Sequence, residues 1–285
     1  MPELPEVETV VQGLRARLEG RRILGVSLHQ PLIVRGDVAL LRRALPKSRI
    51  ERLERRGKFI IVHLEKPTSL RARHCLIVHL GMTGQLFCCR PSLPYEKHTH
   101  VTIELETGEQ LRLRDPRRFG RLEVIPAARL EAYFAHLGAE PFEISLAEFA
   151  ARLARRKAPI KSLLLNQDLV RGLGNIYSDE ALFAARIHPA LPAGRLDVRA
   201  LRRLHRAMQR VLRAAIAAEG TSFSDYVTAD GRLGRFQYRL RVYGREGEPC
   251  RRCRRPIRRL VLTGRSSHYC PHCQPRVRRI VTGRH

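Results

Sequence analysis

The chain has 285 residues and carries 54 Lys and Arg against 27 Asp and Glu, which gives a formal net charge of +27. A hydrophobic fraction of 44% excludes a disordered chain, and no apolar run reaches the ~18 residues that a membrane helix needs. The charge favours a polyanionic partner, above all nucleic acid, although a purely compositional origin of the arginines is the alternative.

The first half of the chain is predicted to be an all-β domain that starts with one helix. Five apolar residues from Val7 to Leu18 recur at helical spacing, which predicts a helix from Glu6 to about Leu18. Short segments rich in branched residues and bounded by turn residues predict strands at Ile23–His29, Phe59–Leu64, Cys75–Leu80, His100–Glu106 and Arg121–Ile125.

After Pro126 the pattern becomes helical. Helices are predicted at Leu130–Leu137, Leu146–Ala154, Ile160–Leu165, Asn175–Ala185 and Asp197–Ala218, the last with Asp197 as its N-cap. Residues 220–234 follow as a polar, glycine-bearing loop that is too long for a simple connector.

The seven cysteines fall into two groups. Cys75, Cys88 and Cys89 lie in apolar stretches and are expected to be small core residues. The other four form two Cys-x-x-Cys pairs separated by sixteen residues, Cys250, Cys253, Cys270 and Cys273. This spacing predicts one structural zinc ion, since four cysteine ligands leave no open position for a catalytic water.

The N-terminus carries a candidate nucleophile. Proline after the initiator methionine permits removal of Met1, which leaves Pro2 with a secondary amine whose pKa is near ~8. Attack by this amine on a sugar C1′ would give a permanently charged iminium that acidifies the C2′ proton, and Glu3 beside it can move protons. The same residues also fit a plain helix start with Pro5 in its first turn.

Six blocks, in order, resemble the formamidopyrimidine-DNA glycosylases, bacterial enzymes that remove 8-oxoguanine. They are PELPEVE at 2–8, RGKF at 56–59, HLGMTG at 79–84, DPRRFG at 115–120, GLGNIY at 172–177 and the four-cysteine finger. The resemblance covers residues 2–273 and implies an α+β, multidomain fold. Its parts would be an N-terminal β-sandwich with an N-terminal helix (2–126), a helical helix–two-turn–helix domain with a base-capping loop (127–240, loop 220–234), a C-terminal zinc finger (241–273) and an added basic tail (274–285).

The resemblance implies a base-excision repair enzyme that excises oxidised purines and then nicks the abasic site by β,δ-elimination. Pro2 would be the Schiff-base nucleophile and Glu3 the proton donor for base loss. Lys58 would be the proton donor of β-elimination, and Arg265 would grip a phosphate and take part in δ-elimination. Lys58 is one of only six lysines in this arginine-rich chain.

For base extrusion the resemblance implies Phe119 as a wedge, Met82 as the filler of the vacated space and Arg117 as the reader of the orphaned base. Without it, an exposed Met82 or Phe119 would be interpreted as packing at a sheet edge. Further DNA contacts are expected at His79, His98, Lys157, Lys161, Asn175 and Tyr243.

The expected partner is damaged double-stranded DNA, bound by a monomer with no membrane association. Glu3, Glu6 and Glu8 stand where a secretory signal carries cations, so we expect a cytoplasmic, nucleoid-associated bacterial protein. Two alternatives stay open: an endonuclease VIII-like enzyme that prefers oxidised pyrimidines, against which the HLGM and DPRRFG blocks argue, and a non-enzymatic zinc-containing nucleic-acid binder.

Overall fold

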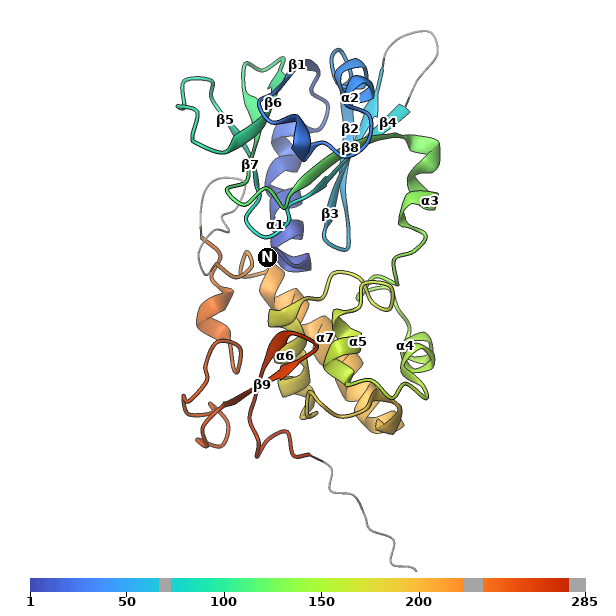
Figure 1. The fold of residues 1–285 in the computed structure, drawn as a ribbon, viewed down its shortest axis with the longest axis vertical. Helices are drawn as coiled ribbons and strands as arrows, with labels where there is room; N and C mark the ends of the chain where they lie inside the picture. The colour runs from blue at the N-terminus through green and yellow to red at the C-terminus, as the bar shows by residue number, and fades with distance from the viewer. Residues whose placement is uncertain (67–72, 223–232, 277–285) are drawn as a thin grey trace, which may run out of the picture. The chain divides into compact units, whose positions relative to one another are not determined.

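The computed structural model describes residues 1–66, 73–222 and 233–276 (Figure 1). The chain divides into two compact units. Unit 1 comprises Met1–His136 and Ala214–Tyr238, and unit 2 comprises Leu137–Arg213 and Arg239–His285. The segment that contains the stems of the predicted base-capping loop therefore packs with the N-terminal half of the chain. Residues 223–232 of that loop lie outside the described residues, as does most of the predicted tail.

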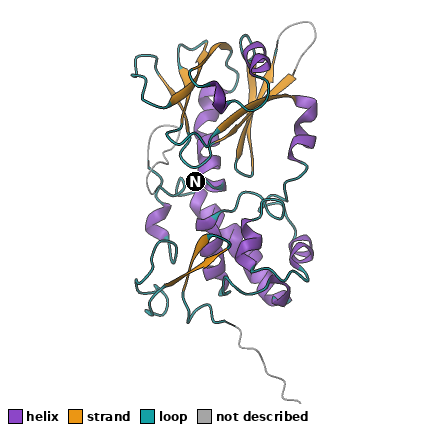
Figure 2. Ribbon diagram, in the orientation of Figure 1, coloured by secondary structure: helices purple, strands orange, loops and turns teal. Residues whose placement is uncertain are grey.

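Unit 1 contains two four-stranded antiparallel sheets, ordered β1-β6-β7-β5 and β2-β3-β4-β8, together with helix α1 at Leu4–Leu18 (Figure 2). The strands are β1 Ile23–Leu28, β2 Arg49–Arg56, β3 Phe59–Glu65, β4 Arg73–His79, β5 Gln85–Cys89, β6 Thr99–Leu105, β7 Gln110–Arg114 and β8 Arg121–Pro126. Unit 1 also contains the short helices α2 Val38–Ala44 and α3 Leu130–Phe134 and the 3-10 helices Pro31–Ile33 and Ala127–Arg129. The β-domain with a leading helix is therefore confirmed.

One core joins α1 to both sheets. In most strands alternate residues enter it, as Ile60 of β3, Val78 of β4 and Leu113 of β7 do, because successive side chains of a strand point to opposite faces. In the sheet β2-β3-β4-β8, the residues between those that enter the core face away from it. Phe59, for example, packs against Phe134 of α3, with ring centroids 5.3 Å apart.

Four elements of unit 1 were not predicted from the sequence: β2, β5, β7 and α2. In β2 the sequence RIERLERR buries only Ile50 and Leu53, and the register shifts between Ile50 and Arg52, so the alternation on which strand prediction depends is broken. β7 alternates regularly but carries only two apolar residues, and the arginine between them is also buried. Arg112 is 1% exposed and donates to the backbone carbonyls of Leu93 and Pro94.

Unit 2 contains α4 Leu146–Leu153, α5 Ile160–Leu165, α6 Asn175–Ala185, most of α7 Val198–Ile216, and the hairpin β9 Arg258–Leu262 with β10 Arg265–Tyr269. The predicted bounds of α5 and α6 are confirmed. Asp197 caps α7 as predicted, since the Ala200 N–H donates to its Oδ1 at 2.6 Å. Within the described residues, no helix is long and apolar enough to cross a membrane.

The three core cysteines are buried as predicted. Cys88 lies in the core between the sheets, and the Cys75 thiol lies 3.6 Å from Nδ1 of His63 on the outward face. Burial raises the pKa of the Cys75 thiol to about 11 and also raises the pKa of Cys89.

Candidate functional site

Pro2 and Glu3 are buried at the start of α1. The Glu3 N–H donates to Oε2 of Glu6 at 2.8 Å, while the Thr221 N–H donates to Oε1 of the same carboxylate at 2.8 Å. Glu6 thus joins Glu3, the residue after the predicted nucleophile, to the stem of the predicted base-capping loop. The sequence analysis assigned Glu6 no role, although its position three residues after Glu3 is the spacing of a capping box.

Lys58 lies on a two-residue turn between β2 and β3, where Arg56 pairs with Phe59. Gly57 has a φ of 55°, a left-handed conformation that glycine adopts without strain. Arg55 holds this turn to α1, because its Nε donates to Glu8 at 2.8 Å and its guanidinium also donates to the Gly57 carbonyl. The turn that carries Lys58, itself 7% exposed, is therefore fixed to the helix that begins next to Glu3.

Met82 and Phe119 lie on two turns whose backbones touch. A Cβ added to Gly81, which has a φ of 61°, would lie 2.4 Å from the carbonyl carbon of Phe119, so only glycine permits this approach. Phe119 is 50% exposed, and the Arg117 guanidinium lies 5.0 Å from the centre of its ring. The three predicted base-extrusion residues therefore belong to one exposed structure.

Asp115 organises these two turns, a role that the sequence analysis missed. Its buried carboxylate accepts hydrogen bonds from the Thr83 hydroxyl and from the N–H groups of Arg117 (3.2 Å) and Gly120 (2.6 Å). Its own N–H donates to the His98 carbonyl at 3.0 Å. An aspartate that precedes a proline at a turn was the available signal, because such side chains commonly bind the backbone two residues on.

His79 ends β4 and holds the start of the Met82 turn, since the Gly81 N–H donates to its Nδ1 at 3.1 Å. Burial, with smaller contributions from Lys58 and Arg121, lowers the pKa of His79 to about 4. The ring is therefore neutral at neutral pH and presents an Nε2–H donor. It can give a phosphate a hydrogen bond without a net charge. His98, the other predicted histidine, is in the left-handed region with a φ of 76°.

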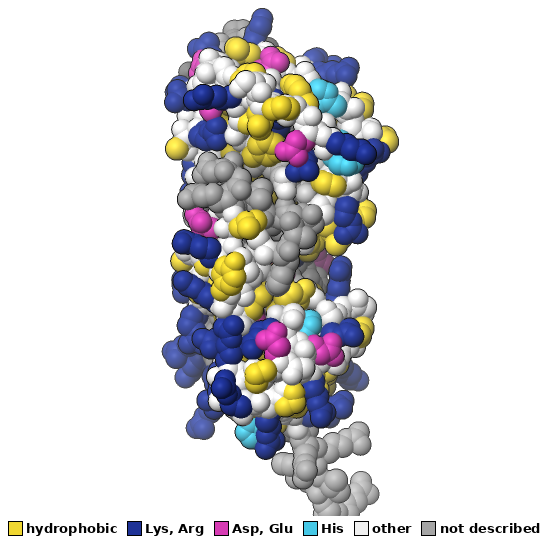
Figure 3. Space-filling view, turned by 90° about the vertical axis from the view of Figure 1, so that its left-hand side faces the viewer, with side chains coloured by type: hydrophobic (Ala, Val, Ile, Leu, Met, Phe, Trp, Pro, Cys, Tyr) yellow, Lys and Arg dark blue, Asp and Glu magenta, His cyan; other side chains and the backbone are white. Residues whose placement is uncertain are grey.

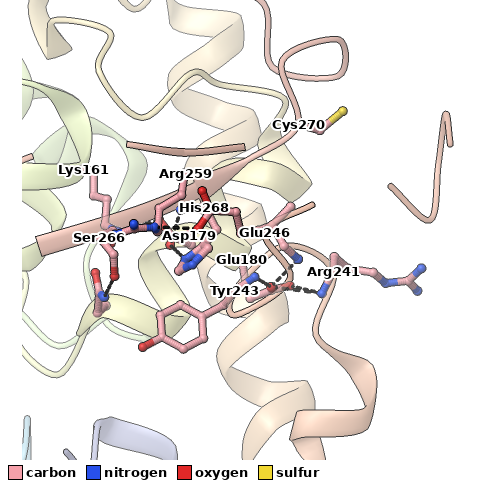
Figure 4. A network of polar contacts seen from close by, with 12 residues as sticks. Lys161, Asp179, Glu180, Arg241, Tyr243, Glu246, Arg259, Ser266, His268 and Cys270 are labelled. Atoms are coloured by element: carbon pink, nitrogen blue, oxygen red, sulfur yellow. Dashed lines mark hydrogen bonds and ion pairs between the residues drawn. The ribbon is translucent and has the colours of Figure 1, made fainter. Parts of the chain in front are cut away.

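In unit 2 the hairpin that carries Arg265 meets α5 and α6 (Figure 4). Asn175, the first residue of α6, donates from Nδ2 to the Ser266 hydroxyl at 3.3 Å. The hairpin turns tightly through Thr263 and Gly264, which both have positive φ, and this leaves Arg265 exposed just after the turn. Arg265 and Asn175, both predicted phosphate contacts, are thus placed on neighbouring elements.

Lys161, one of the expected DNA contacts, lies inside unit 2. Its side chain is fully buried, and its ammonium lies 2.6 Å from Oδ1 of Asp179 and 2.5 Å from the Ser266 carbonyl (Figure 4). The second oxygen of Asp179 accepts from the His268 N–H at 2.8 Å. A lysine buried with a carboxylate cannot also reach solvent, so Lys161 joins the hairpin to α6. Lys157, by contrast, is exposed.

Glu180, the next residue of α6, holds the segment that carries Tyr243. Its carboxylate accepts the backbone N–H groups of Arg241, Val242 and Tyr243 at 2.9–3.0 Å. Burial raises the pKa of this carboxyl, and the three N–H donors oppose that shift. Glu180 was not predicted from the sequence, because nothing in a helix of otherwise ordinary composition signals a buried carboxylate that binds the backbone.

The four finger cysteines converge. Their sulfur atoms all lie within 4.8 Å of one another, and the N–H groups of Arg252 and Cys273 point to Cys250 and Cys270 sulfurs at 3.4 Å. Four thiolates at this spacing fit one tetrahedral zinc ion. Gln274, which the sequence analysis assigned to the tail, belongs to the finger, because it is fully buried and bonds the Cys270 N–H and the Ile187 carbonyl.

The described surface is rich in cations. On the face drawn in Figure 3, Lys and Arg side chains gather over the lower part of the view, with few acidic side chains among them. This distribution agrees with the net charge of +27 and suits a polyanion.

Three family models match the chain. They are the formamidopyrimidine-DNA glycosylase N-terminal domain over residues 1–122, its H2TH domain over 137–227 and the zinc finger found in FPG and IleRS over 247–276. A formamidopyrimidine-DNA glycosylase of Solibacter usitatus is 49% identical over 92% of this chain and 95% of its own. That of Moorella thermoacetica is 46% identical over 91% and 94%.

Solved structures agree with these matches. A complex of a Lactococcus lactis FPG mutant with Fapy-dG-containing DNA is similar with a TM-score of 0.90 and 35% identity, covering 96% of this chain and all of that one. The wild-type L. lactis protein in complex with DNA that contains an oxidised pyrimidine is similar with a TM-score of 0.89 and the same identity and coverage. Fold, finger and blocks thus agree over most of the sequence, and the chain belongs to the formamidopyrimidine-DNA glycosylase family.

Proposed function

We propose that this protein excises oxidised purines and formamidopyrimidines from double-stranded DNA and then nicks the abasic site, with Pro2 as the nucleophile. The named activity of its relatives supports the glycosylase. One observation supports the chemistry: the buried start of α1, with Glu3 next to Pro2 and Lys58 on a turn that the Glu8–Arg55 ion pair holds to the same helix.

In the proposed reaction the Pro2 nitrogen forms a bond to C1′ of the sugar while the bond from C1′ to the base breaks. Glu3 supplies the proton that the departing base takes up, and it passes the proton released by the Pro2 amine to the sugar oxygen as the ring opens. The resulting iminium withdraws electrons, so a proton leaves C2′ and the 3′-phosphate departs by β-elimination, with Lys58 as its proton donor. Arg265 holds a phosphate and assists the second, δ-elimination. Hydrolysis of the iminium then frees Pro2.

The remaining site residues bind DNA in this proposal. Phe119 and Met82 enter the stack as the damaged base leaves it, and Arg117 donates to the orphaned base. His79, His98, Lys157, Asn175 and Tyr243 contact the backbone, whereas Lys161 acts through the hairpin. The zinc ion fixes the finger. The protein acts as a monomer at the bacterial nucleoid.

Borohydride trapping tests the proposal. Protein mixed with a duplex that contains 8-oxoguanine and reduced in place should form a covalent adduct, and peptide mass mapping should locate it on Pro2. A matched protein with an N-terminal tag should neither form the adduct nor cut, because its Pro2 nitrogen is an amide. Full activity in a preparation that entirely retains Met1 would exclude Pro2 as the nucleophile.

Oxidised pyrimidines are a second candidate substrate class, favoured by the similar L. lactis complex with an oxidised pyrimidine. Single-turnover cleavage of paired duplexes with 8-oxoguanine or thymine glycol separates the two classes. We expect faster cleavage of 8-oxoguanine, and faster cleavage of thymine glycol would reverse the assignment.

A further inference from the structure

Helix α7 presents a face made of arginine. At 3.6 residues per turn, six residues fall within an arc of about 100° that extends ~21 Å along the axis. All six are exposed arginines. We call them the arginine stripe: Arg199, Arg202, Arg203, Arg206, Arg210 and Arg213. The opposite side is buried, with Leu204, Met208 and Leu212 each at 0% exposure. The helix is therefore fixed by packing, and the six arginines lie along its exposed face.

No acidic side chain in the described part of the chain neutralises the charges of the stripe. The helix contains no Asp or Glu, and none of the six arginines forms an ion pair with any residue in the described part of the chain. Elsewhere arginines are paired, as Arg152 is with Glu148 on α4. Like charges at i and i+4, such as Arg202 and Arg206, destabilise a helix. An anionic partner would remove this repulsion.

The stripe is separate from the predicted phosphate contacts of unit 2. Arg203 donates from Nε to the carbonyl of Ala185, the last residue of α6, at 3.3 Å. Asn175 is the first residue of the same helix, ten residues away, which corresponds to ~15 Å. The stripe therefore lies near the C-terminal end of α6, whereas Asn175 lies at its N-terminal end.

We propose that the arginine stripe binds a second segment of double-stranded DNA while the excision site holds the first. Charge complementarity supports this partner, since duplex DNA carries one negative charge per ~1.7 Å of its axis and arginine forks match phosphate geometry. The form of the stripe favours a duplex over a single strand. Single-strand binders stack bases on aromatic side chains, and α7 contains no Phe, Tyr or Trp.

Native mass spectrometry of the full chain with an undamaged 20-base-pair duplex tests the proposal, because complexes of one protein with one and with two duplexes differ in mass. The wild type should form the two-duplex complex at low salt. R202Q/R206Q/R210Q should lower its equilibrium constant at least tenfold, whereas excision of 8-oxoguanine from a short duplex should stay within twofold. The control R15Q/R21Q/R42Q removes the same charge from exposed arginines of unit 1 and should keep the two-duplex complex.

Two outcomes would overturn the proposal. One is an equal loss of the two-duplex complex in both triple variants, because bulk charge would then explain the loss. The other is an unchanged equilibrium constant of the two-duplex complex in the stripe variant. Displacement of the second duplex by single-stranded RNA more readily than by duplex DNA would also overturn it. Should the glutamine variant lose excision as well, R202K/R206K/R210K decides. It keeps the charge and must form the two-duplex complex. Undamaged DNA keeps this test independent of the chemistry at Pro2.

Discussion

Replacement of Lys161 or Asp179 should reduce DNA binding although neither residue reaches the surface. Both side chains are fully buried with their charges 2.6 Å apart, so Lys161→Met leaves a buried carboxylate that only the His268 groups still satisfy. Breaking such a pair on one side costs about 3–5 kcal/mol, whereas neutral residues of similar shape on both sides are often tolerated. We therefore expect each single variant to lose about 3 kcal/mol and the K161M/D179N double variant to lose much less than the sum.

Urea unfolding of the four proteins measures this coupling, and duplex affinity gives the functional result. Asp179→Asn removes a negative charge, so bulk electrostatics predicts tighter DNA binding. If Asp179 positions the hairpin that carries Arg265, the same substitution displaces this hairpin and DNA binding becomes weaker instead. In a protein that already carries Arg265→Ala, the addition of Asp179→Asn should lower the duplex affinity only slightly further. Additive unfolding energies together with tighter binding by Asp179→Asn would refute a positioning role for this pair.

The site gives three more tests. Arg117→Ala should slow single-turnover excision of 8-oxoguanine opposite cytosine more than opposite adenine, by the roughly 5- to 150-fold of one lost base contact, and equal losses would remove its reading role. His79→Asn should weaken binding without changing the slope of log K against log[salt], because a pKa of about 4 keeps this ring uncharged. That lowered pKa also means that acidification from pH 6.5 towards 4 destabilises the fold through His79, since the unfolded chain binds the extra proton, and the variant should lose this part of the pH dependence. Cys253→Ser should lose zinc and duplex binding together, and tight binding by the zinc-free variant would contradict a structural metal.

Much of the fold could be predicted from sequence because periodicity reports burial directly. α5 and α6 begin and end at the predicted residues, and the cysteine spacing identifies a finger whose sulfurs converge. β2 was missed because a register shift breaks its alternation, and β7 because it carries only two apolar residues, Leu111 and Leu113, on either side of a buried arginine. The β propensity of their residues does not reveal such strands, because they form by pairing with neighbouring strands.

The site divides in a similar way. Residue types with unusual chemistry, such as an N-terminal proline or a lone lysine after glycine, are visible in sequence. Residues that hold others in place are not, because their role depends on partners far along the chain: Glu6 bonds Thr221, and Lys161 bonds the hairpin more than a hundred residues later. The burial of Lys161 was not predicted for this reason, since a sequence shows its charge but not its pairing with the buried Asp179.

The buried thiols of unit 1 have a consequence for a protein that repairs oxidised DNA. Peroxide attacks thiolates, and oxidation of a cysteine therefore depends on both access and pKa. Cys75 is fully buried with a pKa of about 11, so almost none of it is ionised at neutral pH. The β-domain can then keep its shape under the oxidative stress that creates its substrates. Inactivation by peroxide should begin instead at the finger, where Cys253 and Cys273 are partly exposed, and should release zinc before the sheets unfold.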